Sequence, residues 1–177
     1  MKTFTMTLSL LISITSYGQT ELTSLEDNSK SMHFEDVLQN AQDTSREIQP
    51  FAQRKLAQMF YTGEGTEKDL QKSFDFFKKS AQHGILVSNA DLGYMYYDGE
   101  GTAQDYVQAF NHLRKALGYE LDSKVYYYLG RMYFYGQGTE TNKPVAAYWM
   151  NKAKNTSSEF GYNELAAQFS EENDLDL

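Results

Sequence analysis

Leucine, methionine and aromatic residues recur along the chain in one fixed order, and this order is repeated. The three copies span residues 56–66, 92–102 and 129–139, at spacings of 36 and 37 residues. Within each copy the Leu, Met and aromatic positions follow i, i+3 and i+4, which places them on one face of a helix. A period of this length predicts a solenoid, in which successive units bury one another's apolar faces.

Each unit is predicted to be a pair of helices, A and B, separated by a Gly-x-Gly turn. The expected A helices are 50–62, 87–98 and 124–135. Glycine accepts the left-handed backbone of a helix C-cap, and the glycines that should end the A helices are Gly63, Gly99 and Gly136. The second glycine of each turn should let the chain reverse tightly. The expected N-caps of the B helices are Asp69, Asp105 and Asn142.

Helix B presents a second apolar face, with i, i+4 and i+7 spacing. Its inward positions are Ser73, Phe77 and Ser80, then Ala109, Leu113 and Ala116, then Ala146, Met150 and Ala153. A small residue follows the leucine of every A helix: Ala57, Gly93 and Gly130. Because glycine inside a helix costs about 1 kcal/mol, its recurrence indicates that helix B approaches helix A closely there.

The two ends of the array carry incomplete units. Phe34, Val37 and Ala41 predict a lone helix before the first pair, and 165–169 repeats part of the A pattern after the last one. Unpaired terminal helices would shield the open ends of a solenoid. The predicted segments are a capping helix and loop at 32–49, repeats at 50–85, 86–121 and 122–157, a capping helix at 158–170 and an acidic tail at 171–177.

The repeated residues resemble the signature of the Sel1-like repeat family, which is related to the tetratricopeptide repeats. That signature reads approximately Leu-Gly-x-x-Tyr-x-x-Gly-x-Gly, then Asp, then Ala-x-x-Trp-x-x-Lys-Ala. The second unit matches at Leu92, Gly93, Tyr96, Gly99, Gly101, Asp105, Ala109, Lys115 and Ala116, with His112 at the Trp position. The third unit keeps Trp149 but has Asn142 for Asp. The first unit departs at Ala57, Phe60, Ser73, Phe76 and Ser80.

The resemblance implies an all-α fold, a right-handed α-solenoid of antiparallel helix pairs with three Sel1-like repeats plus capping half-repeats. It also implies an interaction scaffold rather than an enzyme. A strict tetratricopeptide array is the near alternative, but its period is about 34 residues and it lacks the Gly-x-Gly turn.

The resemblance further implies that helix A lines a concave face, where its variable positions would meet a partner. These positions are Arg54, Gln58, Tyr61, Tyr94, Tyr97, Tyr127, Arg131 and Phe134. Tyr and Arg are the residue types that dominate binding hot spots. The repetition of Tyr61, Tyr97 and Phe134 equally fits a structural role, in which they pack between neighbouring units.

Composition and charge exclude several kinds of ligand and site. A net charge of -8 argues against nucleic acid or an anionic membrane as the main ligand. The chain has no cysteine, so it can form neither a disulfide nor a Cys-ligated metal site. No His lies at a spacing typical of a metal site, and His112, at the Trp position, is expected to pack. We therefore expect no catalytic residue, no metal and no cofactor, while the resemblance implies a protein or peptide partner.

Residues 1–18 have the pattern of a secretory signal peptide. Lys2 precedes an uncharged, largely apolar stretch at 4–14, and Ser16 and Gly18 place small residues before a cleavage point. The stretch is too short to span a membrane. We expect cleavage after Gly18, a flexible leader at 19–31, and an exported protein that is periplasmic or secreted.

Two other functions fit the same sequence. One is a cell-envelope hydrolase or a binder of cell-wall fragments or β-lactams, an activity implied by exported relatives that carry a disulfide in each repeat. The absence of cysteine argues against that transfer. The other is a purely structural or assembly role with no small ligand.

Overall fold

The computed structural model describes residues 33–43, 47–117, 123–158 and 160–175, and all regular secondary structure in these ranges is helical. The helices are α2 (Phe34–Gln42), α3 (Gln49–Thr62), α4 (Leu70–Gln82), α5 (Leu86–Asp98), α6 (Tyr106–Ala116), α7 (Ser123–Tyr135), α8 (Lys143–Lys154) and α9 (Tyr162–Glu172). The expected signal peptide, 1–18, and the leader, 19–31, lie outside the described residues.

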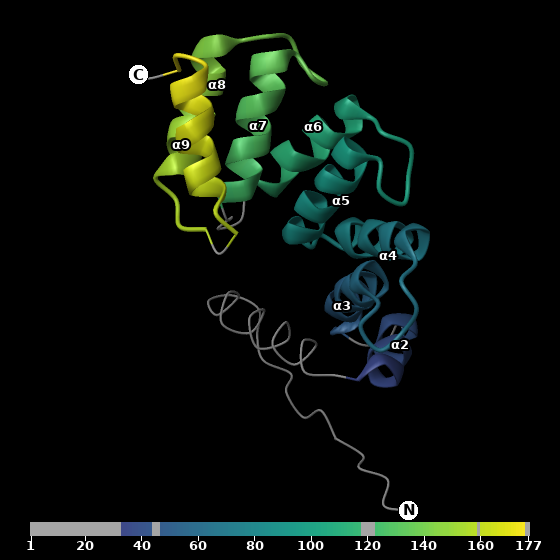
Figure 1. Ribbon diagram of the computed structural model, residues 1–177. Coiled ribbons are helices and arrows are strands. Elements are labelled where there is room, and N and C mark those ends of the chain that lie inside the picture. The colour runs from purple at the N-terminus through teal and green to yellow at the C-terminus, as the bar shows by residue number, and fades with distance from the viewer. Residues whose placement is uncertain (1–32, 44–46, 118–122, 159, 176–177) are drawn as a thin grey trace, which may run out of the picture.

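The helices form three pairs, α3–α4, α5–α6 and α7–α8, which follow one another along a bent array (Figure 1). The lone α2 packs against α3, and α9 packs against both α7 and α8. In Figure 1, α3 and α5 lie nearer the inside of the bend than α4 and α6. The predicted all-α solenoid with a capping helix at each end is confirmed. None of the described helices combines the length and apolar character needed to cross a bilayer.

Close contact inside each pair depends on the small residue that follows the buried leucine of helix A. A Cβ on Gly93 would lie 2.6 Å from Cγ of Leu113, and one on Gly130 would lie 2.9 Å from Cε of Met150. Leu113 and Met150 are fully buried. The recurrent small position therefore lets the B helix insert a large core side chain against the A-helix backbone, as predicted.

The second glycine of each turn has a structural role that the sequence did not reveal. Gly101 has φ +68°, and a Cβ on it would lie 2.0 Å from the carbonyl oxygen of Leu70, the first residue of α4. A Cβ on Gly138 would likewise overlap the carbonyl oxygen of Tyr106, the first residue of α6. The second and third turns therefore rest on the start of the preceding B helix, and their second glycines form part of the junction between units.

The helix caps agree with the sequence prediction. The Asp105 carboxylate accepts hydrogen bonds from the backbone N–H groups of Val107 and Gln108 at the start of α6. Asp69 caps α4 and Asn142 caps α8 in the same manner. These side chains satisfy backbone donors that have no partner inside the helix.

The C-terminal end differs from the expected acidic tail. Helix α9 continues to Glu172, and beyond it the Leu175 side chain is only 6% exposed, in a cluster with Met150 and Phe169. By contrast, Leu165, the repeat equivalent of the fully buried Leu129, is 43% exposed. The physical reason is that no B helix follows α9 in the described chain, so nothing covers the position that each complete unit buries.

Candidate partner-binding surface

The first group of predicted site residues joins unit one to unit two. The Nε of Arg54 lies 3.1 Å from Oδ2 of Asp91, which links α3 to α5. The Tyr61 hydroxyl donates to Oε2 of Glu100 at 2.6 Å. This hydrogen bond, followed by burial, raises the pKa of Tyr61 to about 12. Gln58 lies between these two contacts and is half-buried.

The same kind of contact recurs one unit later. The Tyr97 hydroxyl donates to Oε1 of Gln137 at 2.8 Å, and only 6% of the Tyr97 surface is exposed. Glu100 and Gln137 are the residues between the two glycines of their turns. The third member of this column, Phe134, packs edge-on against Phe169 of α9, with ring centroids 5.3 Å apart. All three column residues thus make contacts between neighbouring units.

Helices α5, α7 and α9 together carry a half-buried group of rings and cations that we call the tyrosine–cation cluster. Its members are Tyr94, Lys124, Tyr127, Tyr128, Arg131 and Tyr162. The Tyr94 and Tyr128 ring centroids are 5.0 Å apart, and those of Tyr127 and Tyr162 are 5.6 Å apart. The Lys124 ammonium lies 3.9 Å from the Tyr94 ring centroid, within the range of a cation–π contact.

Arg131 has an unusual environment within this cluster. Its guanidinium carbon lies 5.8 Å from the ring centroids of both Tyr97 and Tyr127 and 5.9 Å from that of Tyr135. Its Nε is buried and makes no hydrogen bond within the described residues. A buried donor without an acceptor is costly, so this part of the Arg131 side chain is held at an energetic cost by the packing around it.

Asp98 interacts electrostatically with Tyr128, Lys124 and Arg131 of the cluster. Burial, and then the nearby Asp98 charge, raises the pKa of Tyr128. Burial also raises the pKa of Asp98, and Glu100 adds to the effect, while Lys124 and Arg131 oppose it. A hydrogen bond to Tyr162 adds to the rise in the pKa of Tyr128, so the Tyr128 phenol stays protonated at neutral pH and is already engaged within the cluster.

The structure brings some of the predicted residues together and separates others. Tyr94, Tyr97, Tyr127, Arg131 and Phe134 lie at or beside the cluster, whereas Arg54, Gln58 and Tyr61 lie on α3 and its junction. Sequence reasoning missed Lys124, Tyr128 and Tyr162. The available signal was the tyrosine run 126–128, which places rings on several sides of α7.

No group of three or more side chains suited to hold a metal ion is found in the part of the chain that the structure describes. Together, the helix pairs and this aromatic surface define a helical-repeat protein. A model of the Sel1 repeat matches residues 50–85, 87–117 and 123–155. The chain belongs to the Sel1 repeat family, whose members are generally non-catalytic scaffolds that mediate protein interactions.

Two solved structures share this fold. One is a protective antigen present in uropathogenic Escherichia coli strains, displaying an SLR fold, with a TM-score of 0.61 and 32% identity over 70% of this chain and 25% of that one. The other is a Sel1 repeat protein from Oxalobacter formigenes, with a TM-score of 0.58 and 24% identity over 76% of this chain and 53% of that one. This chain thus spans a quarter to about half of their lengths. No curated protein matches it.

Proposed function

We propose that this protein is a scaffold that binds a protein or peptide partner through the tyrosine–cation cluster. The observation that carries the proposal is Arg131, a half-buried cation whose guanidinium lies among three tyrosine rings. Membership of a family that mediates protein interactions supports it.

The chemistry of the cluster favours a partner that combines apolar side chains with carbonyl or carboxylate oxygens. Tyrosine supplies a large contact area at a low entropic cost, because it has only two side-chain torsions. The rings already pack on one another, as do Tyr94 and Tyr128, so binding would need little further ordering. The positive charges of Lys124 and Arg131 would attract the oxygens of the partner.

The test begins with peptides selected from a random library against the full chain, whose affinities are then measured by calorimetry. We expect Arg131→Ala and Tyr94→Ala each to weaken binding at least tenfold, the size of effect that defines a hot spot. The melting temperature should change little, because both side chains are only half-buried.

Matched controls come from the B helices. Arg114, whose guanidinium lies 5.6 Å from the Phe110 ring centroid, and Tyr148, 53% exposed on α8, are residues of the same types away from the cluster. Arg114→Ala and Tyr148→Ala should bind as the wild type does. Equal losses in the controls, or a fall in binding that tracks a fall in stability, would refute the proposal.

We also propose that the protein acts outside the cytoplasm, in the periplasm or as a secreted protein, after cleavage behind Gly18. The charged start, the apolar stretch and the small residues before Gln19 support this. Mass spectrometry of the protein from fractionated cells should find Gln19 as the mature N-terminus in the exported fraction. An intact Met1 form confined to the cytoplasm would contradict it.

A further inference from the structure

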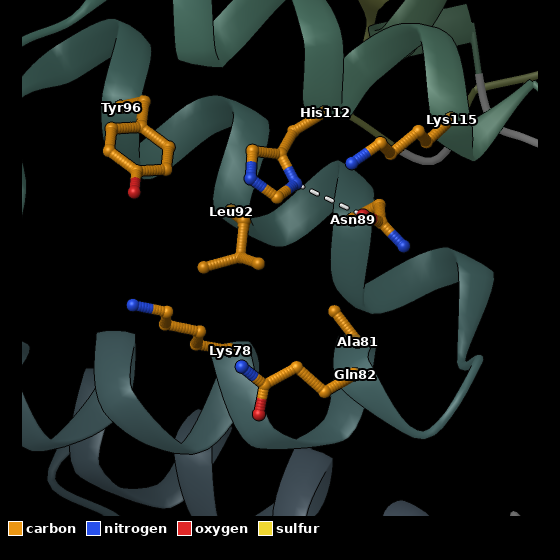
Figure 2. A pocket seen from close by; sticks show the side chains of 8 residues that line it. All are labelled: Lys78, Ala81, Gln82, Asn89, Leu92, Tyr96, His112 and Lys115. Atoms are coloured by element: carbon orange, nitrogen blue, oxygen red, sulfur yellow. Dashed lines mark hydrogen bonds between the residues drawn. The ribbon is translucent and has the colours of Figure 1, made fainter.

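A pocket of about 210 Å³ lies between the first and second repeats (Figure 2). Helix α4 forms one wall with Lys78, Ala81 and Gln82, and the facing wall comes from α5 and α6 with Asn89, Leu92, Tyr96, His112 and Lys115. Leu92 is an apolar side chain in this lining, whereas Lys78 and Lys115 are exposed cations. Two lysines facing one small hollow are notable in a chain whose net charge is -8.

The pocket coincides with the position at which the second repeat departs from its neighbours. In the first repeat Phe60 stacks on Phe76, with ring centroids 5.8 Å apart, and in the third Tyr126 stacks on Trp149 at the same separation. The second repeat has His112 at the position of Phe76 and Trp149, and Asn89 at the position of Tyr126. Compared with the third repeat, two large rings are therefore replaced by two smaller polar side chains. Compared with the first repeat, which has Gln53 at the position of Asn89, only the ring of Phe76 is replaced, and His112 keeps the equivalent stack on Tyr96.

The lysine of this repeat position is also in a different environment. In the first and third repeats its ammonium covers a ring: Lys79 lies 4.6 Å from the Phe76 centroid and Lys152 lies 4.6 Å from the Tyr126 centroid. The equivalent Lys115 makes neither a ring contact nor an ion pair within the described residues, and Lys78 likewise makes none. Both ammonium groups are available to a ligand.

Asn89 and Tyr96 hold His112 in one orientation. Its Nδ1 lies 3.0 Å from Oδ1 of Asn89, so Nδ1 carries the proton and donates it to that oxygen. The ring also stacks on Tyr96, with centroids 5.5 Å apart and an interplanar angle of 17°. This leaves Nε2 as the ring nitrogen that can take up a proton when a negative charge binds.

We propose that this pocket binds a small organic carboxylate, with its anionic oxygens between Lys78 and Lys115 and its carbon skeleton against Leu92 and Ala81. The volume limits the ligand to a few carbon atoms, because pockets for drug-sized molecules are about 300–1,000 Å³. Exposed lysines are point charges that do not impose the bidentate geometry of arginine. The site should therefore select a ligand by its negative charge and its size, and not by the shape of its anionic group.

This site is separate from the tyrosine–cation cluster. Tyr94 is five residues from Asn89 and two from Tyr96, so it lies about 140° or more around α5 from both. The partner surface and the pocket therefore occupy opposite sides of the same helix. Either proposal can fail without affecting the other.

The test is a calorimetric titration of the full chain with glutarate at constant ionic strength. Glutaramide is the neutral probe of the same size, and inorganic phosphate is the probe with charge but no carbon skeleton. We expect glutarate to bind with a dissociation constant in the millimolar range or below, and glutaramide not to bind. Phosphate binding weaker than that of glutarate supports contact with the apolar wall. Phosphate binding equal to or tighter than glutarate contradicts that contact.

Variants locate the binding. Lys78→Gln and Lys115→Gln should each weaken glutarate binding at least threefold, and both together should abolish it. The matched control is Lys152→Gln, the equivalent lysine of the third repeat, which should bind as the wild type does. His112→Trp restores the residue found at Trp149 and should fill the pocket and abolish binding. If the two lysine variants bind glutarate normally, or if glutaramide binds equally well, the proposal is wrong.

The titration of His112 provides an independent measurement. Burial, with Lys115 and Lys78 nearby, lowers the pKa of His112, and Tyr96 faces it from α5. Bound glutarate should offset the lysine charges and raise this pKa, which is measurable from the imidazole proton shifts by NMR. Exposed His83, at the end of α4, is the internal control. No difference between the two histidines on adding glutarate would overturn the assignment.

Discussion

At the residue scale, Gly101 and Gly138, the second glycines of the last two turns, leave no room for a Cβ. Gly101 has φ +68°, and any Cβ there would overlap the Leu70 carbonyl at 2.0 Å. Leu70 is the first residue of α4, and its carbonyl belongs to the helix backbone. A flexible side chain could rotate away from such a contact, but a helix start can move only with its helix.

We predict that Gly101→Ala lowers the free energy of unfolding by about 3 kcal/mol or more. Part of this is the left-handed backbone, which costs an alanine about 1–2 kcal/mol, and the rest is the displacement of α4. Gly84→Ala is the matched control, since Gly84 has φ +88° and no heavy atom within 4 Å of the place that a Cβ would take. Gly84→Ala should therefore lower the free energy of unfolding only by the cost of the left-handed backbone. Urea unfolding of both variants measures the difference, and equal losses would contradict the junction.

A second residue-scale prediction concerns Tyr61 and its bond to Glu100. The folded pKa of about 12 lies above the ordinary value of 10.0, so the contribution of protonated Tyr61 is fully present below pH 10. It is lost as the pH rises through 12, because the unfolded chain releases this proton first. The loss of stability between pH 9 and pH 11.5 should be smaller in Tyr61→Phe than in the wild type, as measured by urea unfolding.

The control for that experiment is Tyr148→Phe, which removes an exposed hydroxyl on α8. It should show the same loss between the two pH values as the wild type, since lysine titration affects all three proteins alike. If Tyr61→Phe also behaves as the wild type does, the Tyr61–Glu100 bond does not contribute to stability.

Sequence reasoning succeeded at residues whose role is local and failed where the role depends on a distant neighbour. The caps Asp69, Asp105 and Asn142 follow from their position alone, and all three accept backbone hydrogen bonds as expected. The packing of His112 was also expected, and its ring stacks on Tyr96. The pocket beside it was missed, because it depends on Lys78 from the preceding unit.

At the scale of single helices, sharp ends were easier to predict than starts. The A helices end at Thr62, Asp98 and Tyr135, as expected, because a glycine follows each. Each begins one residue earlier than expected, at Gln49, Leu86 and Ser123. The residues before two of these starts, Ile48 and Ile85, provide no side-chain cap, so these starts lack the capping signal that marks the B helices.

The capping helix α9 gives a prediction at this scale. Phe169 is 8% exposed and packs among the Tyr127, Phe134 and Tyr135 rings, so Phe169→Ala should cost about 3–5 kcal/mol. Leu165→Ala on the same helix removes a 43% exposed side chain and should cost about 0.5 kcal/mol. Thermal unfolding of the two variants measures both losses of stability. A larger loss in Leu165→Ala would mean that the opposite face of α9 is the buried one.

At the scale of the whole molecule, stability should be graded along the array, because each unit contacts only its neighbours. Helix α5 packs against α4 and α6, whereas the terminal α2 packs against α3. We predict that hydrogen exchange, followed by mass spectrometry, is slowest in α5 and α6 and fastest in α2 and α9. Uniform protection of all the helices would instead indicate one cooperative unit.

The fit of each turn glycine on the preceding helix start has a consequence for how such an array can grow. A whole unit contains both parts of this contact. Its turn supplies the glycine, and the first residue of its B helix supplies the surface on which the glycine of the next unit packs. Duplicating 86–121 in frame would therefore supply a new contact at each side, whereas adding part of a unit would leave one part unmatched. Arrays built in this way lengthen by copying complete modules.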